Sequence, residues 1–328
     1  MQDSISRTAG IVEPAPKKRR WFARAECQLG LLLAIAGLIG SRLGHLWVAF
    51  DVFSQFTLQF AVVALGFLGG LLVPRAKLLV AFVIIIAGHL AIGAWSHVAS
   101  SAPNIISELK TGERPLAVAS FNTWHDNREI DAVQAEIERL NADVITLVEF
   151  GPNKRALIAK LQSRYPYHAE CLGKDYCHLA ILSKIPILKS DSRVGWEGPP
   201  LITASFGPEY GNLTVIGVHT IRFPHSRAQF RQIQALTKLI ETIPGRRLMM
   251  GDFNATPFSR ITSAIAEQTG LVRLTMLPTW PSRFDLPQVA IDHIFASPGI
   301  RVLEDERIGR PAGSDHYPIT MKLAVPAG

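Results

Sequence analysis

Two long runs without a charged residue lie in the first third of the chain, and they constrain its architecture more than any other feature. No Asp, Glu, Lys or Arg occurs in residues 52–74 or 78–107. A membrane-crossing helix needs about 20 mostly apolar residues. An earlier apolar stretch is interrupted by Arg42, whose side chain would have to reach toward a membrane interface. The predicted spans are 27–49, 55–73 and 78–98.

Other interpretations of these segments fit less well. Helices of a hairpin buried in a soluble protein usually show a polar stripe, which these segments lack. A cleavable signal peptide would be followed by a mature domain, whereas two further apolar runs follow the first one here. Transport through the helices is disfavoured, since they contain no repeat and no paired charges.

The net charge of +7 is concentrated around the apolar segments. Residues 1–26 hold six Lys or Arg and three acidic residues, whereas residues 100–328 are nearly balanced. Basic residues before the first span and in the turn after the second (Arg75, Lys77) predict that both places are cytoplasmic. Three spans would then put everything after about residue 99 outside the cytoplasm. Failure of the first span to insert would reverse this orientation.

These observations predict a multi-pass protein of the inner (plasma) membrane, with a periplasmic domain if the source is a Gram-negative bacterium. The expected parts are a basic cytoplasmic tail (1–26), a transmembrane region (27–99), a linker (100–114) and a folded domain (115–325).

Apolar strands alternate with amphipathic helices after the linker, which indicates a layered α/β or α+β domain. The expected strands are 116–121, 144–148, 178–182, 201–206, 213–218, 248–250, 289–296 and 317–323. The expected helices are 129–140, 152–161, 226–241 and 260–268.

Three cysteines are too few for a disulfide framework. Cys171 and Cys177 are six residues apart, which fits a small disulfide loop outside the cytoplasm and fits two free thiols equally well. His178 adjoins them, but the spacing of a four-ligand metal site is absent.

Polar residues follow several of the apolar strands at the point where each strand ends. Asn122, Glu149 and His219 each end one strand, and Asp252 and Asn254 follow Leu-Met-Met-Gly. Strand ends deliver side chains to one rim of a sheet. Carboxylates, amides and imidazoles together suit Mg²⁺ and phosphate chemistry. Each residue alone could be a turn former or a buried polar group, so the prediction depends on the ordered set.

The order of six short motifs resembles the endonuclease/exonuclease/phosphatase superfamily, which has a deoxyribonuclease-like fold. The motifs are Ser-Phe-Asn-Thr-Trp (120–124), Leu-Val-Glu (147–149), Gly-Val-His (217–219), Gly-Asp-Phe-Asn-Ala-Thr-Pro (251–257), Ile-Asp-His-Ile (291–294) and Ser-Asp-His-Tyr-Pro (314–318). The resemblance covers residues 113–325. With the apolar segments before it, this domain is similar to the membrane-anchored bacterial branch of the superfamily.

The resemblance implies a fold and an activity. The fold is a four-layered α/β sandwich, with two packed β-sheets flanked by helices, preceded here by about three transmembrane helices. The activity is hydrolysis of phosphate ester bonds with Mg²⁺ or Mn²⁺ as cofactor, as in phosphodiesterases, nucleases and phosphatases.

The resemblance also implies roles for the motif residues. Asn122 and Glu149 would bind the divalent metal, and Asp315 would help to hold the metal side of the site. Asp252 would orient or deprotonate the attacking water, and Asn254 would hold that water or a phosphate oxygen.

Two histidines would face the phosphate. His316, paired with Asp292, would contact the scissile phosphate as the second catalytic group. His219 would donate to the phosphate as negative charge builds on it.

The chain departs from the family pattern in three places. Leu-Val precedes Glu149 where many members have Gln. Tyr176, seven residues before Ser183, is the candidate for a tyrosine that many members carry ahead of the Leu-Ser-Lys strand. Arg222 and His225 are additional candidates for phosphate contacts, and solvated loop charges are the equal alternative.

The fold does not choose the substrate, which can be a nucleic acid, a lipid head group or a small phosphodiester. DNA repair is disfavoured because the domain is nearly neutral and is expected to face away from the chromosome. The lipid bilayer is an expected partner, and no protein partner can be inferred. The alternative function is a catalytically silent module that binds phosphorylated ligands or a partner. The presence of every matched site residue favours the enzyme.

Overall fold

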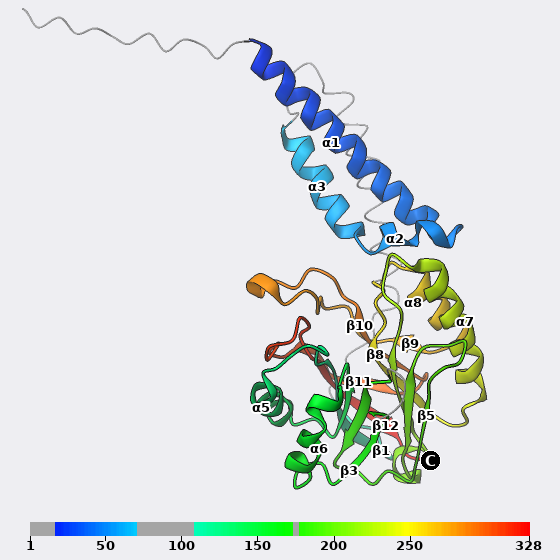
Figure 1. Cartoon of the computed structure of the whole chain (residues 1–328). Coiled ribbons are helices and arrows are strands. Elements are labelled where there is room, and N and C mark those ends of the chain that lie inside the picture. The colour runs from blue at the N-terminus through cyan, green and yellow to red at the C-terminus, as the bar shows by residue number, and fades with distance from the viewer. Residues whose placement is uncertain (1–16, 71–107, 173–176) are drawn as a thin grey trace, which may run out of the picture.

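The computed structural model describes residues 17–70, 108–172 and 177–328, which form a helical hairpin and a globular domain (Figure 1). The hairpin consists of α1 (Lys17–Leu43) and α3 (Thr57–Gly70). Two short helices, η1 (Val48–Phe50) and α2 (Asp51–Ser54), join them. Figure 1 shows both long helices rising from one end of the domain, with the junction between them lying against it.

Two six-stranded β-sheets pack face to face in the domain. The first has the order β11 (Arg301–Ile308), β12 (Ile319–Pro326), β1 (Glu113–Asn122), β2 (Val144–Val148), β4 (Leu179–Ser183) and β3 (Tyr167–Glu170). The second has the order β5 (Lys189–Arg193), β6 (Leu201–Ser205), β7 (Thr214–His219), β8 (Arg247–Asp252), β10 (Asp292–Ala296) and β9 (Val272–Arg273). The two central pairs, β1–β2 and β7–β8, are parallel, and the other pairs are antiparallel.

Helices cover the outer face of each sheet. The first sheet carries α5 (Ile130–Leu140), η3 (Pro152–Lys154) and α6 (Ala156–Leu161). The second carries α7 (Ser226–Thr242) and α8 (Arg260–Thr269). Short turns, η4 (Pro208–Tyr210) and η5 (Arg283–Asp285), complete the domain. The expected α/β sandwich of two packed sheets with flanking helices is thus confirmed.

Three apolar cores separate these layers, because the central strands are buried on both faces. In β1, Val118 packs into the core between the sheets, whereas its neighbour Ala119 packs under α5. In β7, Val215 and Ile216 divide in the same way between the central core and the core under α7 and α8. Strands buried on both faces appear in the sequence as continuous apolar runs, which is why these strands could be predicted.

Four strands are not predicted by the sequence, and these are the outer strands of both sheets: β3, β5, β9 and β11. Every residue of β5 is exposed, and β11 buries only one of its eight residues. An edge strand with little burial has no apolar run to reveal it. The predicted strand 289–296 begins only at Asp292, because Val289 instead forms an isolated bridge with Trp280. Strand β1 begins at Glu113, inside the expected linker.

The apolar N-terminal segments differ in part from the expectation. Within the described residues, one helix is long and apolar enough to cross a membrane, Ala25–Leu43. Helices of this kind occur both as membrane spans and as signal sequences. A second candidate is the pair Val48–Ser54 and Thr57–Leu68, which is bent by 59°.

The predicted spans are revised accordingly. The span 27–49 was predicted too long: α1 ends at Leu43, because the chain turns at Gly44, whose backbone is packed closely against Asp51. The predicted span 55–73 coincides with α3 as far as the structure describes it. The third predicted span, 78–98, lies outside the described residues, so about three spans are not shown.

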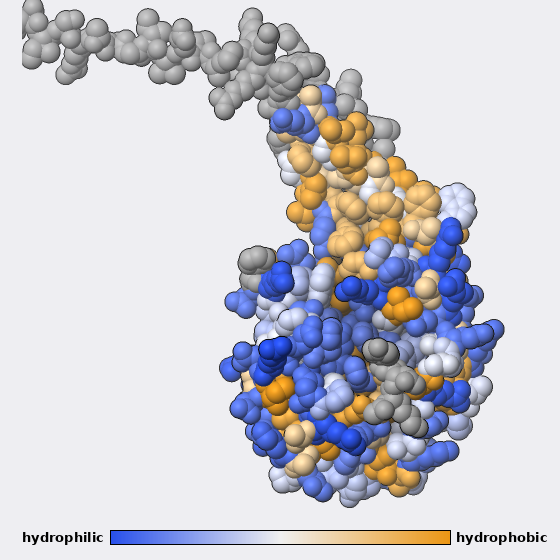
Figure 2. Space-filling view, viewed as in Figure 1, coloured by the Kyte–Doolittle hydropathy of each residue, from blue (hydrophilic) through white to orange (hydrophobic). Residues whose placement is uncertain are grey.

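Helices α1 and α3 pack closely and leave apolar outer faces. The rings of Phe67 and Phe60 lie where a Cβ atom on Gly30 or Gly37 would clash with them, at 2.4 and 2.6 Å. The opposite sides carry large apolar residues such as Leu32 and Val62, which are 65% and 68% exposed. Figure 2 shows this apolar surface covering the hairpin and ending where the polar surface of the domain begins.

Candidate active site

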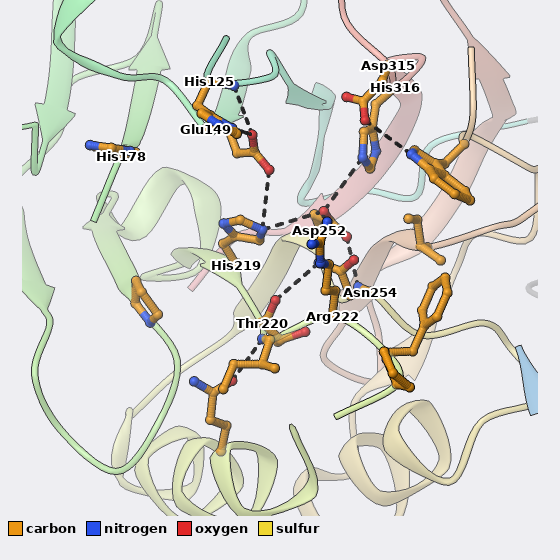
Figure 3. Close-up of a pocket in the computed structure, with 17 residues that line it drawn as sticks. His125, Glu149, His178, His219, Thr220, Arg222, Asp252, Asn254, Asp315 and His316 are labelled. Atoms are coloured by element: carbon orange, nitrogen blue, oxygen red, sulfur yellow. Dashed lines mark hydrogen bonds and ion pairs between the residues drawn. The ribbon is translucent and has the colours of Figure 1, made fainter. Parts of the chain in front are cut away.

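The carboxyl ends of the two parallel strand pairs meet at one rim of the sandwich. Asn122 of β1 is in register with Val148 of β2, and His219 of β7 is in register with Asp252 of β8. The two sheets therefore bring their polar strand ends face to face. A pocket of about 840 Å³ opens there, lined among others by Glu149, His219, Asp252, Asn254, Asp315 and His316 (Figure 3).

Glu149 is held from three sides as an anion. Its Oε2 atom accepts a hydrogen bond from the backbone N–H of His125 at 2.8 Å and lies 2.7 Å from Nδ1 of the same residue. Its Oε1 atom lies 3.3 Å from Nδ2 of Asn122 and 3.7 Å from Nε2 of His219. Burial alone would raise the pKa of Glu149, but His219 and these hydrogen bonds outweigh it and lower the pKa to about 2.

Asn122 joins the two sheets beneath the pocket. Its Nδ2 atom donates to Oδ2 of Asp252 at 3.0 Å as well as to Glu149. Asn254 approaches Asp252 from the other side, donating from its backbone N–H at 2.8 Å and from Nδ2 at 3.1 Å. Burial raises the pKa of Asp252 to about 8. The charge of His316 lowers this pKa and that of Asp292 raises it, and burial has the larger effect.

His316 and Asp292 form a buried pair next to Asp252. The Nδ1 atom of His316 lies 2.7 Å from Oδ2 of Asp292, and its Nε2 atom lies 3.8 Å from Oδ2 of Asp252. Burial disfavours the charged ring, but the charge and hydrogen bond of Asp292 raise the pKa of His316 to about 10. For His219 burial dominates and lowers the pKa. Of these two histidines, His316 is therefore an imidazolium and His219 is neutral at pH 7.

The backbone is bent into the left-handed region at several of these strand ends. The φ angle is 51° at Glu149, 47° at Asn254 and 53° at Trp124. Asn tolerates this conformation, whereas it is uncommon for Glu. The Glu149 carbonyl is held by the hydroxyl of Thr123 at 3.1 Å. Such conformations persist only where surrounding contacts enforce them, which is typical of functional sites.

The side chains are suited to a divalent cation. Glu149, His219 and Asp252 bring ligand atoms within 4.8 Å of one another, as do Asp252, Asp292 and His316. In the second group the His316 imidazolium already compensates the charge of Asp292. The first group contains the anionic Glu149, and carboxylate oxygens are donors that Mg²⁺ prefers. Asp315 belongs to neither group, and its Oδ2 atom accepts a hydrogen bond from Nε1 of Trp280 at 3.2 Å.

The three predicted substrate contacts are placed differently. Arg222 lines the pocket. His225 is exposed at the start of α7 and does not line it, because the turn at 222–225 directs the chain away from the rim. Tyr176 lies outside the described residues. Cys171 and Cys177, which the sequence left open, form a disulfide with their Cα atoms 5.7 Å apart.

Several residues of the site were not found from the sequence. Lys154 is fully buried, and its Nζ donates to the carbonyl of Trp124 at 2.7 Å, which holds the loop that carries His125. Burial lowers the pKa of Lys154 to about 8. The residues next to Lys154 in the sequence are like those around a surface lysine, so no local pattern predicts that its side chain is buried. His125 directly follows the Ser-Phe-Asn-Thr-Trp motif, and that adjacency was the available signal.

Known proteins are similar to this chain in sequence pattern and in fold. A sequence model of the endonuclease/exonuclease/phosphatase family matches residues 119–316, which include nearly all of the residues described above. No curated protein sequence matches the chain significantly.

Solved structures share the fold. Sphingomyelinase C from Streptomyces griseocarneus superimposes with a TM-score of 0.50 at 15% identity, covering 65% of this chain and 99% of its own. SmcL gives a TM-score of 0.51 at 16% identity, covering 64% and 98%. A humanised TDP2 of D. rerio gives 0.51 at 16% identity, also covering 64% and 98%. At such identities the similarity establishes a common fold alone.

Proposed function

The chain belongs to the endonuclease/exonuclease/phosphatase family, and on that premise we propose that it is a membrane-anchored phosphoesterase whose active site lies outside the cytoplasm. Enzymes of this family hydrolyse phosphoesters and use Mg²⁺. The observation that carries the proposal is the convergence of Glu149, Asp252 and His316 from both sheets on one pocket.

The metal-binding role falls to the first sheet. Glu149 is anionic at neutral pH and faces the pocket, and Asn122 lies directly behind it. Bound there, Mg²⁺ or Mn²⁺ supplies positive charge beside the phosphate group. Asp315, which also lines the pocket, is proposed to help to hold the metal.

The second sheet provides most of the proton-transfer groups, and His316 comes from the loop between β11 and β12 of the first sheet. Asp252 is proposed to orient the attacking water and to take its proton, while Asn254 holds the water or a phosphate oxygen. The water oxygen forms a bond to phosphorus, the ester P–O bond breaks, and the leaving oxygen takes up a proton. His316, kept protonated by Asp292, and His219 donate to phosphate oxygens as charge builds. Arg222 is proposed to bind the phosphate group of the substrate at the mouth of the pocket.

The topology proposal rests on the two ends of α1. Basic residues occupy its first turns, and its last turn leads into a junction that lies against the globular domain. A helix of 27 residues is about 40 Å long, enough to separate these ends by a bilayer. The positive-inside rule puts the basic end in the cytoplasm and therefore the domain outside. The Cys171–Cys177 disulfide fits an oxidising compartment.

We accordingly propose the following organisation of the chain. Residues 1–26 form a cytoplasmic tail and 27–99 a multi-pass membrane region, whose third span, 78–98, returns the chain to the outer side. Residues 100–112 link it to the catalytic domain, which begins with β1 at Glu113.

The test is a hydrolysis assay of the full-length protein in detergent or nanodiscs, with bis(p-nitrophenyl) phosphate and Mg²⁺. We expect turnover that EDTA abolishes and that His316→Ala and Asp252→Asn each reduce by at least about 10²-fold. Exposed residues of the same types, tested as His168→Ala and Asp191→Asn, serve as matched controls and should retain full activity. Metal binding without any turnover would contradict the proposal and favour the catalytically silent module.

A further inference from the structure

The junction between α1 and α3 is fastened to the catalytic domain by a buried polar contact. The Asp51 carboxylate accepts hydrogen bonds from the backbone N–H of Arg260 at 2.7 Å and from the hydroxyl of Ser259 at 2.5 Å. Ser259 is the N-cap of α8, so Asp51 reinforces the start of that helix. Gln55 accepts from the backbone N–H of Thr256 at 2.8 Å. Asp51 and Gln55 are 0% and 1% exposed, so this contact excludes solvent.

The same junction supports an apolar wall of the active-site pocket. The ring of Phe56 packs edge-on against Phe223 with 5.6 Å between centroids, and Phe223 packs against Trp280 at 6.4 Å. Phe223 and Trp280 both line the pocket, together with Ile221 and Ile291. Trp280 in turn donates to Asp315. Phe56, in the junction just before α3, thus touches a side chain that lines the catalytic pocket.

Exposed apolar side chains at the turn after α1 indicate where the surface of a bilayer would lie. Leu46 and Trp47, at the turn after α1, are 68% and 60% exposed. Trp is enriched at membrane–water interfaces, and exposed apolar residues next to the apolar outer faces of α1 and α3 would be unfavourable in water. Because the junction is docked on the domain, insertion of these residues at a membrane interface would place the pocket at the depth of the lipid head groups.

We propose that the substrate is a lipid phosphoester that remains in the bilayer during hydrolysis. Its phosphate group would reach Asp252 and His316, while its apolar part would pass along Phe223 and Trp280 toward Phe56 and the membrane. This inference rests on the proposed phosphoesterase function and adds its substrate class. A nucleic acid has no apolar tail to contact the wall, and it would have to approach a pocket that lies against the membrane surface.

The experiment compares two substrates of the full-length protein reconstituted into phosphatidylcholine and phosphatidylglycerol vesicles, and a single-stranded oligonucleotide is assayed beside them. One is the vesicle phospholipid and the other is water-soluble bis(p-nitrophenyl) phosphate, both with Mg²⁺. The test variant is Phe56→Ala. The matched control is Phe53→Ala, because Phe53 packs inside the hairpin against Phe60 and Gly40 rather than on Phe223.

We expect Phe56→Ala to lower lipid hydrolysis about fivefold to tenfold, since one aromatic contact is lost. Hydrolysis of the soluble ester should stay within twofold of the wild type, and Phe53→Ala should affect neither substrate. Phe56→Leu, which keeps most of the apolar volume, should recover much of the lipid activity and serves as the second variant if Phe56→Ala does not fold.

Four results would overturn the inference. Equal losses on both substrates in Phe56→Leu and Phe56→Ala would make the contact merely structural. No loss on lipid would make Phe56 irrelevant to the substrate. Faster hydrolysis of a single-stranded oligonucleotide than of the vesicle lipid would indicate a nucleic-acid substrate. Turnover of neither ester by the wild type would count against the proposed phosphoesterase itself, whereas turnover of the soluble ester alone would count only against the lipid.

Discussion

The Nδ1 atom of His316 lies 2.7 Å from the carboxylate of Asp292, and both side chains are almost fully excluded from solvent. The other carboxylate oxygen, Oδ1, has no hydrogen-bond partner among the described residues. Keeping a buried carboxylate in this state costs free energy, because nothing else compensates its burial. In return, the carboxylate of Asp292 fixes the orientation of the His316 ring and keeps that ring protonated.

Asp292→Asn should therefore affect catalysis more than binding. The amide cannot stabilise the imidazolium, so we expect kcat to fall by about 10²-fold or more while KM changes little. Steady-state kinetics on the soluble ester would measure this, with thermal unfolding as a check that the variant is folded. A folded variant with kcat within threefold of the wild type would refute the role assigned to the pair.

A second histidine, His293, is buried without a charge partner on its ring. Its Nε2 atom lies 2.8 Å from the carbonyl of Ala255, and its Nδ1 atom lies 3.3 Å from the hydroxyl of Thr275. Burial lowers the pKa of His293 to about 3, so the ring stays neutral in the folded protein. In the unfolded chain His293 takes up a proton as the pH falls through about 6.5, whereas in the folded protein its ring stays neutral at that pH. Stability from this residue is therefore present above pH 6.5 and is lost as the pH falls from 6.5 toward 3.

His293→Gln should flatten that acid dependence. The amide still donates to Ala255 and does not titrate, so the unfolding midpoint should fall less between pH 6.5 and 4.5 than in the wild type. One proton is equivalent to about 1.4 kcal/mol per pH unit at most. Thermal unfolding at several pH values would measure the slopes, and the exposed His168→Gln should reproduce the wild-type slope. Equal slopes for all three proteins would exclude His293 as the source.

At the scale of elements, α8 depends on a side chain from the other end of the chain. Its N-terminus is capped by Ser259 and is then covered by Asp51, more than 200 positions earlier in sequence. Both partners are buried, so loss of the carboxylate would leave the Ser259 hydroxyl and the Arg260 N–H without an acceptor.

Asp51→Ala should loosen the start of α8 and leave distant helices unchanged. We expect a loss of about 2 kcal/mol in local stability, seen as faster hydrogen exchange at the amides of Arg260 and Ile261. The amides of α5, on the opposite sheet, provide the internal control. Unchanged exchange at Arg260 would show that the junction does not hold the helix.

At the scale of the whole molecule, the hairpin and the domain act as one unit because the junction is docked. Under the proposed topology, insertion of α1 and α3 would then decide on which side of the membrane the domain lies. The basic residues at the start of α1 oppose transfer of that end across the membrane. The whole catalytic domain should follow the junction to the outer side.

Reporter fusions after Gly328 test this orientation in a Gram-negative host. Alkaline phosphatase, which folds only outside the cytoplasm, should be active in the fusion, and green fluorescent protein exported by the same route should be dark. Mutating the basic residues of the first turns of α1 to Gln should weaken the bias. A fluorescent fusion with inactive phosphatase would place the domain in the cytoplasm and contradict the proposed topology.

Central strands and most of the motif residues could be predicted because their signals are local. Strands β1, β2, β7 and β8 are apolar on both faces, and the polar residue that ends each run is visible in the sequence. The edge strands could not be predicted, since one side of each has no partner strand and most of their residues face water. Lys154 could not be predicted either, because its burial depends on a loop 30 positions away.

The sequence by itself determined the apolar segments, the buried strands and the residue types at their carboxyl ends, because hydrophobic burial leaves an apolar run that is visible in a short window. Only the tertiary structure decided which of those ends face each other, that His125 and Lys154 support Glu149, and that Asp51 and Phe56 dock beside the pocket. These contacts join residues up to 209 positions apart. They arise when two sheets and a helical hairpin close on one another, and no local pattern of side chains records that closure.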